Sequence, residues 1–376
     1  MNDLLKMADF EELPRSTVDL DAAVRTGRAR ERRNRVLQVT AVAAAVLVVA
    51  AGVALAADRR PAPRPVAPSP SPSVSMPPWV CAVEPVEFQI DAIDPTGRFT
   101  VTWPVHSSGR PPLLSADGAA PREMTGLPGV DPLPNEVNPS GVVIGSSSRE
   151  PLSRERIGWV HRDGGTEHLR LPEQASWVEP RAINARGDIV GLAYDGSTTD
   201  VGGITALGPP MGAVLWPASP PGTVQMLSGR GEYFEPGWIT DDGSVAGSAN
   251  GTPTVRRPDG TFVRLAEFSN LTGISGDWAF GFMQAGGGGR YNIRTGSTED
   301  LGTFMPWVAL GEGRLAGEID GGRDPGRPAI WHAGTAEPLP SPAQAESTRI
   351  THGGGRTVTA VMRFNGVQTR AVTWRC

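Results

Sequence analysis

The side chains that usually perform catalysis are few and scattered in this chain. Its histidines show neither an HExxH arrangement nor another spacing typical of metal ligands. They are His106, His161, His168, His332 and His352. The sequence also contains no GxSxG motif, no Walker loop and no dinucleotide-binding fingerprint on a strand–helix unit. We therefore predict no catalytic residue, no metal site and no cofactor site.

Three polar or glycine-rich patterns look like sites but have simpler explanations. The glycine run at residues 286–289 has no helix after it, so a flexible turn is favoured over a phosphate cradle. Asp241-Asp242-Gly243 lacks the further oxygen ligands of a calcium loop and is typical of a hairpin turn. Paired acids such as Glu299-Asp300 are used by glycosidases. With 32 acids after residue 78, such pairs arise by chance.

The only two cysteines, Cys81 and Cys376, are far apart in the sequence. Neither belongs to a CxxC motif or lies near a histidine, which argues against metal binding. In a non-cytoplasmic compartment such a pair indicates a disulfide. Closing a loop of this length would restrict the unfolded chain by about 5 kcal/mol in an entropy model. Two free thiols are the alternative.

A degenerate unit recurs about seven times between Ile90 and the C-terminus. The clearest copy spans residues 183–191 and combines an apolar residue, a short polar residue, a turn glycine and a hydrophobic return strand. The turn glycines are Gly97, Gly141, Gly187, Gly243, Gly276, Gly313 and Gly354, roughly 33 to 56 residues apart. A second glycine is expected to end the return strand at Gly145, Gly191, Gly247 and Gly317. Each copy therefore predicts a β-hairpin, since Asn, Asp or Gly supplies the positive φ of a tight turn.

Two more strands complete each unit. An apolar strand that often carries tryptophan follows the hairpin, and then a strand that ends in leucine. The strand tryptophans are Trp159, Trp216, Trp331 and Trp374, and core packing is favoured for them over a sugar-stacking role. Four strands per unit and seven units predict an all-β fold, a β-propeller of seven four-stranded blades stacked around an axis.

The repeat resembles a known family. The residues that carry the resemblance are Ala182-Ile183-Asn184, Gly187, Ile189-Val190-Gly191, Ala213, Trp216 and Asp300-Leu301-Gly302-Thr303. They are similar to the HAF-type probable extracellular repeat, and the resemblance covers residues 90–376. It is clear in the third copy, partial in the second, fourth and sixth, and poor in the fifth and seventh. The resemblance implies a β-propeller outside a bacterial cell and brings no catalytic residue. Irregular all-β structure with a chance similarity is the alternative.

The last repeat has no leucine-ending strand after the strand of Trp374. Residues 81–90, which include Val86-Glu87-Phe88-Gln89-Ile90, precede the first hairpin and have no partner strand of their own. We expect this segment to supply the missing strand of the final blade, because pairing the two ends of the repeat region removes exposed sheet edges.

The chain before the repeats divides into three parts. Residues 36–57 are almost entirely apolar and long enough, at about 33 Å as a helix, to cross a bilayer. The larger arginine cluster precedes them, which predicts residues 1–35 as a cytoplasmic tail. Residues 58–78 form a Pro/Ser-rich extracellular linker, and residues 79–376 the propeller. A signal peptide cleaved after Ala54-Leu55-Ala56 is the alternative.

The N-terminal part of the tail is acidic, and the part that precedes residue 36 is basic. It resembles short tails before single spans in actinobacterial membrane proteins, and one lysine against 34 arginines fits a GC-rich genome. A topology signal with anionic-lipid contact is favoured over docking of a cytoplasmic regulator such as a sigma factor, since no Cys/His zinc module is present.

Residues 79–376 carry 24 arginines and 32 acids, a net charge of −8, which argues against nucleic acid as a ligand. Propeller geometry places a ligand surface at one mouth of the channel, near the residues that lead into each hairpin. The candidate ligand-binding residues are Asp91, Asn135, Glu136, Arg181 and Arg349. The remaining copies carry Gly237, Thr272, Val308 and Thr348 there, so we expect polar chemistry mainly in the first three blades. An insertion at residues 196–210 is expected to form a lip.

These features predict a single-pass plasma-membrane protein whose extracellular propeller binds a protein or cell-envelope ligand without catalysis. One alternative is a signalling receptor with a regulator at its tail. Another is an enzyme that acts on envelope glycans.

Overall fold

The computed structural model describes residues 79–376 except 87, 105–109, 152, 202–203, 229–232, 322–323, 342–344 and 365–367. The predicted tail, membrane helix and linker lie outside the described residues, so these assignments stay predictions. Within the described part, no helix has the length and apolar character needed to span a bilayer.

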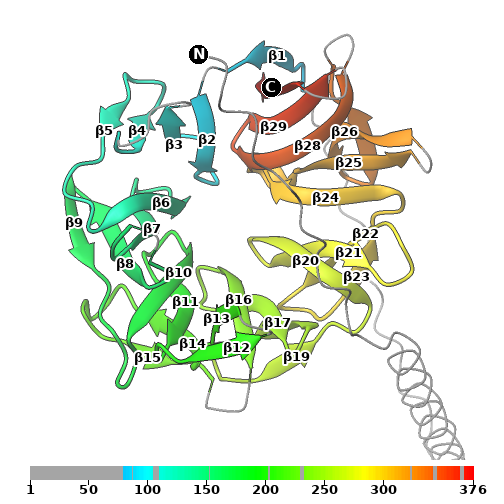
Figure 1. The fold of residues 1–376 in the computed structure, drawn as a ribbon. Coiled ribbons are helices and arrows are strands. Elements are labelled where there is room, and N and C mark those ends of the chain that lie inside the picture. The colour runs from blue at the N-terminus through cyan, green and yellow to red at the C-terminus, as the bar shows by residue number, and fades with distance from the viewer. Residues whose placement is uncertain are drawn as a thin grey trace, which may run out of the picture. The chain divides into compact units, whose positions relative to one another are not determined.

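Seven four-stranded antiparallel sheets surround a central axis, as Figure 1 shows. The strands of each blade are given from the innermost outward. Blade 1 consists of β2 (Phe88–Ile93), β3 (Phe99–Pro104), β4 (Leu113–Ala116) and β5 (Arg122–Glu123), and blade 2 of β6 (Val130–Val137), β7 (Val143–Ser148), β8 (Arg156–Arg162) and β9 (Gly165–His168). Blade 3 consists of β10 (Trp177–Ile183), β11 (Ile189–Tyr194), β14 (Gly212–Trp216) and β15 (Gln225–Met226), and blade 4 of β16 (Phe234–Ile239), β17 (Val245–Ala249), β18 (Thr252–Arg256) and β19 (Phe262–Arg264). Blade 5 consists of β20 (Phe268–Ser275), β21 (Trp278–Met283), β22 (Gly288–Asn292) and β23 (Thr298–Asp300), and blade 6 of β24 (Phe304–Ala309), β25 (Leu315–Gly321), β26 (Asp324–His332) and β27 (Thr335–Pro338). Blade 7 consists of β28 (Ala345–Gly354), β29 (Thr357–Phe364), β30 (Gln368–Arg375) and β1 (Ala82–Pro85). The predicted fold class and blade number are confirmed.

The seventh blade joins the two ends of the domain. Strand β1 pairs with β30 in antiparallel register from Ala82 opposite Arg375 to Pro85 opposite Val372. Cys81 and Cys376 form a disulfide directly beside this pair. Closure by the N-terminal segment and the disulfide are therefore confirmed. The segment is shorter than predicted, because residues 88–90 already belong to β2, the innermost strand of blade 1.

The hairpin tips show why a short polar residue precedes the turn glycine. The side chain of Asn138 accepts hydrogen bonds from the backbone N–H groups of Ser140 and Val142, both at 3.0 Å, and Gly141 has a φ of 77°. The side chain of Asn thus replaces missing strand partners at the turn. Blade 7 departs from the prediction, because its positive-φ glycine is Gly355 rather than Gly354.

Each innermost strand carries a β-bulge that the sequence reading did not predict. The bulged residues nearest the hairpin tips are Asp91, Asn135, Arg181, Gly237, Thr272, Trp307 and Thr351, and the innermost strands of blades 2, 5 and 7 have a second register shift earlier in the strand. In four blades the preceding residue is a proline, which the channel-side edge tolerates because no strand pairs there.

The prediction that a second glycine ends the return strand was wrong. Gly145, Gly191, Gly247 and Gly317 lie inside their strands, each opposite a proline that precedes a bulge. A Cβ atom on Gly191 would lie 2.2 Å from the carbonyl oxygen of Glu179. Glycine is needed there because the bulge pushes the neighbouring backbone against it.

The core lies between adjacent blades and includes the predicted tryptophans. Trp159, Trp216, Trp331 and Trp374 are all buried. The indole N–H of Trp159 donates to Ser147 Oγ at 2.9 Å, and that of Trp374 donates to the carbonyl oxygen of Pro340 at 2.7 Å. The four tryptophans are therefore core residues, as predicted.

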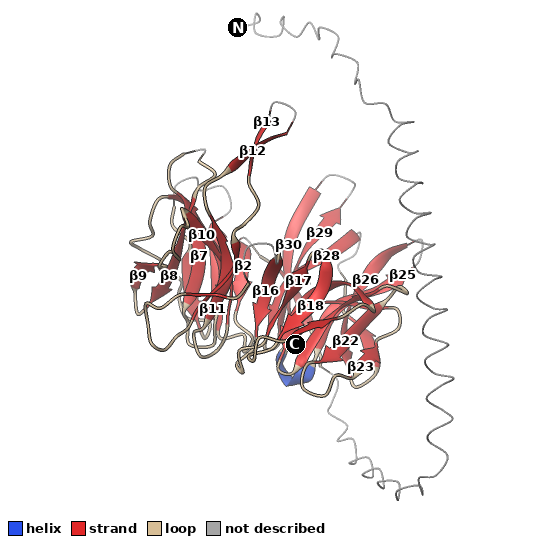
Figure 2. Cartoon of the chain, turned by 90° about the horizontal axis from the view of Figure 1, so that it is seen from below, coloured by secondary structure: helices blue, strands red, loops and turns tan. Residues whose placement is uncertain are grey.

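The insertion in blade 3 forms a separate two-stranded hairpin, β12 (Thr198–Val201) with β13 (Ile204–Leu207). Figure 2 shows this hairpin standing clear of the ring on one face. It begins after β11, whose last residue Tyr194 pairs with Trp177, the first residue of β10.

Candidate functional site

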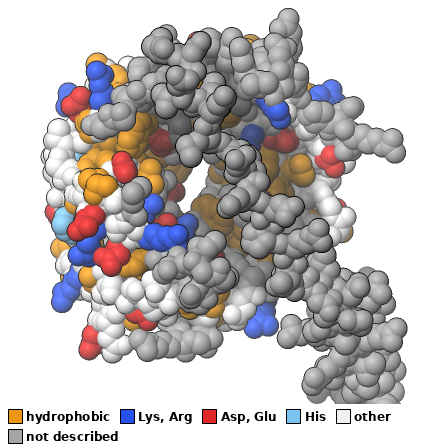
Figure 3. Space-filling model, in the orientation of Figure 1, with side chains coloured by type: hydrophobic (Ala, Val, Ile, Leu, Met, Phe, Trp, Pro, Cys, Tyr) orange, Lys and Arg blue, Asp and Glu red, His pale blue; other side chains and the backbone are white. Residues whose placement is uncertain are grey.

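The innermost strands of all seven blades surround a channel of about 760 Å³. Because an inserted bulge residue projects from the regular ladder, six of the seven bulges contribute to the channel wall. Those six residues are Asn135, Arg181, Gly237, Thr272, Trp307 and Thr351. In Figure 3, hydrophobic side chains line much of the central hollow, with basic and acidic side chains beside it.

The structure brings together three of the five predicted site residues. Asn135, Glu136 and Arg181 line the channel. Asp91 occupies the bulge of blade 1 and is half-buried, but it is not among the channel-lining residues. Arg349 lines a second hollow. The predicted polar residues therefore line two hollows, and they are not concentrated in the first three blades as predicted.

Arg181 lies among charged residues of blades 3 and 4. Its Nη2 is 3.3 Å from Oε2 of Glu179 and 3.8 Å from Oε1 of Glu235. Its Nε is buried and makes no hydrogen bond. The guanidinium thus has two acidic neighbours and one donor nitrogen without a hydrogen-bond partner.

Asn135 and Glu136 are occupied by contacts between blades. The Asn135 side-chain amide donates to the carbonyl oxygen of Pro180, and Oε2 of Glu136 accepts from the N–H of Ile183 at 2.6 Å. Burial raises the pKa of Glu136 to about 8, opposed by the hydrogen bond from Ile183. The raised pKa favours the uncharged form of Glu136, and its contact with Ile183 ties blade 2 to blade 3.

A larger hollow of about 1020 Å³ opens between blades 5, 6 and 7, and we call it the blade 5–7 pocket. Its lining residues are Asn270, Leu271, Thr272, Trp307, Ser347, Thr348, Arg349, Ile350, Thr351, His352, Val361 and Arg363. Thr272, Trp307, Thr351 and His352 also line the channel, so the two hollows adjoin.

Two unpartnered polar atoms mark the boundary between the pocket and the channel. Among the residues that the structure describes, Nε1 of Trp307 and Nδ1 of His352 are buried without a hydrogen-bond partner. The Trp307 ring is held edge-on against Phe282, with ring centroids 5.0 Å apart. Burial lowers the pKa of His352 to about 4, so its ring is neutral at pH 7. An indole N–H only donates, whereas a neutral imidazole nitrogen either donates or accepts.

Trp307 and His352 were missed from the sequence as site residues. Their blades were represented instead by Val308 and Thr348, and the bulges actually place Trp307 and Thr351 at the channel. A tryptophan directly after Pro306 was the available signal, since Pro also precedes the bulges of blades 2, 3 and 4.

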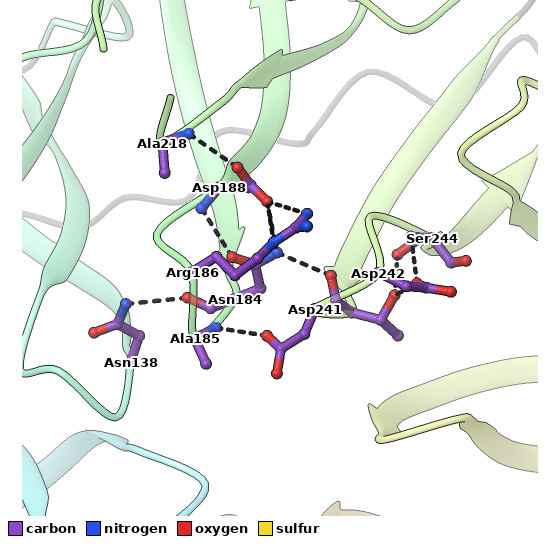
Figure 4. Close-up of polar contacts among 10 residues, drawn as sticks. Asn138, Asn184, Ala185, Arg186, Asp188, Ala218, Asp241, Asp242 and Ser244 are labelled. Carbon is purple, nitrogen blue, oxygen red and sulfur yellow. Dashed lines mark hydrogen bonds and ion pairs between the residues drawn. The ribbon is translucent and has the colours of Figure 1, made fainter. Parts of the chain in front are cut away.

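The hairpin tips on another part of the channel form a chain of polar contacts, drawn in Figure 4. The side-chain amide of Asn138 donates to Asn184 O at 3.0 Å, and that of Asn184 donates to Thr240 O at 2.9 Å. Asp241 Oδ1 accepts from the backbone N–H of Ala185 at 2.9 Å. The tips of blades 2 and 3 thus each bind the tip of the following blade, which is a structural role.

Asp188 anchors the same chain of contacts. Burial alone would raise the pKa of Asp188, but hydrogen bonds from Ala218, Asn184 and Arg186 hold it below the usual value. The Arg186 guanidinium is 2.6 Å from the Asp188 carboxylate. Asp242 caps its own turn by accepting from Ser244 N at 2.9 Å. Across the described residues, no three His, Cys, Asp or Glu side chains gather in a way that could hold a metal ion.

Comparisons with known proteins establish the fold. No family model matches the chain, and no curated protein matches it. Oligogalacturonate lyase from Vibrio parahaemolyticus superposes with a TM-score of 0.51 at 10% identity, over 79% of this chain and 97% of that one. The chain is a seven-bladed β-propeller. The HAF-type family is not shown beyond the propeller fold that the resemblance implies.

Two further solved structures are similar at lower scores. Virginiamycin B lyase from Staphylococcus aureus gives a TM-score of 0.48 at 13% identity, covering 79% of this chain and 100% of that chain. A puromycin-hydrolyzing peptidase from Mycobacterium tuberculosis gives 0.47 at 14% identity, covering 76% of this chain and 50% of that chain. At these identities the likeness concerns the fold alone.

Proposed function

We propose that this propeller is a non-enzymatic binding module that takes its ligand in the blade 5–7 pocket. The observation that carries the proposal is the pair of buried, unpartnered atoms Trp307 Nε1 and His352 Nδ1 at the inner end of that pocket. A buried donor or acceptor without a partner costs about 1–3 kcal/mol. A ligand that bonds to either atom would recover part of that cost, which supports a pocket suited to polar contact.

The composition of the pocket supports the proposal of a binding site. Thr272 already donates to Pro306 O at 2.8 Å, and the His352 ring is neutral. The lining contains hydroxyl, amide, indole, imidazole and guanidinium groups but no carboxylate. General acid–base chemistry by a pair of carboxylates is therefore not supported there.

We further propose that the propeller is displayed outside the cell by residues 36–57, with the tail of residues 1–35 in the cytoplasm. The disulfide between Cys81 and Cys376 supports a non-cytoplasmic location, because such bonds are rare in reducing compartments. The HAF-type resemblance supports the same placement. Membrane fractionation tests the anchor: full-length protein should remain in membranes after a high-salt wash, and deletion of residues 36–57 should release it. Retention of the deleted form would contradict the anchor.

The binding role is tested by filling the pocket. In Thr348→Trp, an indole occupies the pocket from β28, whereas Arg264→Trp places the same group at an exposed position on the outermost strand of blade 4. Full-length wild type and both variants are crosslinked in intact cells and purified, and the crosslinked envelope components are identified. We expect Arg264→Trp to recover the wild-type set and Thr348→Trp to lose a specific component. Equal recovery by both variants, with unchanged melting temperatures, would contradict a ligand site in the pocket.

A further inference from the structure

The ionisable residues that line the blade 5–7 pocket are neutral or already have a partner. Arg363 has an interaction partner within the chain. Arg349 lies close enough to Glu318 for its charge to oppose the rise that burial causes in the pKa of that carboxyl. His352 is neutral at pH 7, because burial lowers its pKa to about 4. The lining contains neither Asp nor Glu, so a ligand needs no formal charge to match this pocket.

Three uncharged polar side chains in the lining are open to a ligand. They belong to Asn270, Ser347 and Thr348, and none of them has a hydrogen-bond partner among the residues that the structure describes. Asn270 and Ser347 are exposed and Thr348 is half-buried, so a ligand can reach all three. An amide group and a hydroxyl group each donate and accept hydrogen bonds. These side chains therefore suit ligand groups that both donate and accept.

Strand register sets Ser347 beside an apolar side chain. In the β28–β29 ladder, Arg349 lies opposite Val361, and Ser347 lies opposite Arg363. Alternate residues of a strand share a face, so Ser347 and Val361 project from the same face of blade 7 as diagonal neighbours. The Val361 side chain is 39% exposed and lines the pocket, which leaves an apolar surface uncovered next to the Ser347 hydroxyl.

Trp307 adds an apolar surface from blade 6. It occupies a bulge and is half-buried, whereas the strand tryptophans are buried in the core. Its Nε1 is buried, so the accessible part of the indole ring is carbon. Phe282 packs edge-on against this ring, with centroids 5.0 Å apart, and holds it in place. The pocket therefore combines carbon surfaces with uncharged groups that donate and accept.

A sugar matches both kinds of surface. Its ring presents C–H groups on its faces and carries hydroxyl groups around its edge, and each hydroxyl both donates and accepts. The pocket volume of about 1020 Å³ lies at the upper end for small-molecule sites, which are about 300–1,000 Å³. The pocket is therefore large enough for more than one sugar ring.

We propose that the blade 5–7 pocket binds an uncharged carbohydrate. The ring carbons lie against Trp307 and Val361. The hydroxyl groups form hydrogen bonds with Asn270, Ser347 and Thr348. This inference rests on the proposed binding function and specifies the class of its ligand.

A set of trisaccharides tests the ligand class. Cellotriose, triacetylchitotriose, mannotriose and arabinotriose are the neutral probes. Triethylene glycol is the control without a sugar ring, and cellotriose oxidised to carboxylates at carbon 6 is the charged control. Each is titrated by calorimetry into full-length protein in detergent at constant ionic strength. We expect at least one neutral trisaccharide to bind about tenfold or more tightly than triethylene glycol, and the carboxylates not to strengthen binding of cellotriose.

A pair of threonine variants assigns the binding to the pocket. Thr348→Val removes a pocket hydroxyl while keeping the side-chain shape, and Thr298→Val makes the same change at an exposed position on β23. We expect Thr348→Val to weaken binding of the best probe about three- to tenfold and Thr298→Val to leave it unchanged.

Two substitutions of Trp307 test the apolar contact. Trp307→Phe keeps an aromatic surface and should hold binding within about threefold of wild type, whereas Trp307→Ala should weaken it about tenfold or more. Melting temperatures show that each variant is folded. If Trp307→Ala does not fold, the comparison of the two threonine variants still decides the location.

Several outcomes would overturn the inference. These are no binding of any neutral trisaccharide, tenfold tighter binding of the carboxylated cellotriose than of cellotriose, or equal effects of Thr348→Val and Thr298→Val. The capture experiment with Thr348→Trp decides the binding function separately, because it does not depend on the ligand class. Loss of a protein component in that experiment would keep the binding function and overturn the carbohydrate.

Discussion

A polar side chain that lines the channel is not always available to a ligand, as Asn135, Glu136 and Arg181 show. Asn135 and Glu136 bond to the backbone of the next blade, and Arg181 contacts Glu179 and Glu235. In blades 6 and 7, Trp307 Nε1 and His352 Nδ1 are buried without a hydrogen-bond partner, as Nε of Arg181 is in blade 3. The contacts that a channel side chain already makes therefore limit what it can offer to a ligand.

Glu136 makes stability depend on pH in a predictable direction. Its pKa of about 8 in the folded protein exceeds the usual carboxyl value, so between about pH 4.5 and 8 the folded state holds a proton that the unfolded state has released. Stability therefore falls as pH rises through this window. We expect Glu136→Gln to lessen that fall, by an amount on the order of a few kcal/mol at most between pH 5 and 8.

Denaturant unfolding at pH 5, 6.5 and 8 measures the effect. Glu123→Gln is the matched control, because Glu123 is exposed on the outermost strand β5. Parallel pH profiles for wild type and Glu136→Gln would show that the Glu136 carboxyl is not protonated in the folded state.

The bulged inner strand is the element that shapes the channel. In blades 2, 3, 4 and 6 a proline precedes the bulge and a glycine lies opposite that proline. The proline needs no strand partner, and the glycine makes room for the displaced carbonyl. The proline–glycine pair therefore specifies a bulge, and the bulge sends one residue of the blade into the channel.

Two alanine substitutions test this element. In Gly191→Ala the new Cβ would lie 2.2 Å from Glu179 O, so the bulge must move, at a cost of about 1–3 kcal/mol. Gly237 is itself a bulge residue, and its nearest atom to a new Cβ, Ala246 O, is 3.7 Å away. We expect Gly237→Ala to stay within about 1 kcal/mol of wild type. Thermal unfolding of both variants provides the comparison, and equal losses would show that the clash at Gly191 is relieved cheaply.

The hairpins could be predicted from sequence because their tips obey a local rule. Asn138 and Asn184 bond to their own turns, so a polar residue three positions before a glycine marks the tip. The channel residues of blades 6 and 7 could not be located by the same rule. In blades 6 and 7, Leu310 and Gly354 occupy the position that Asn138 and Asn184 occupy in blades 2 and 3. The predicted channel residue was therefore wrong by one position in blade 6 and by three positions in blade 7.

The pocket itself depends on long-range geometry. Its lining comes from blades 5, 6 and 7. Arg349 was selected from sequence for a different reason, as a residue preceding a hairpin. No local pattern shows that Arg349 and Trp307 line one hollow, because blade packing alone brings them together.

At the scale of the whole molecule, the ring is held at its seam by a strand pair and a disulfide. The disulfide closes a loop with a sequence separation of 295 residues. An entropy model gives a stabilisation of about 5 kcal/mol, an upper value because the unfolded chain retains some structure. We expect the double variant Cys81→Ser with Cys376→Ser to fold with all seven blades but to unfold at a lower denaturant concentration.

The comparison is made between oxidised wild type, reduced wild type and the double variant, each followed by circular dichroism. Reduced wild type and the double variant should agree. If both matched oxidised wild type, pairing of β1 with β30 alone would account for the stability of the seam.

The seam also makes the domain a covalent ring, from Cys81 through seven blades to Cys376. A protease that cuts once inside this ring cannot release a fragment. The β12–β13 hairpin, which stands clear of the blades in Figure 2, is the natural place for such a cut. The nicked protein would migrate as one species without reductant and as two with it. Shedding part of the propeller therefore requires either two cuts or one cut and an electron donor.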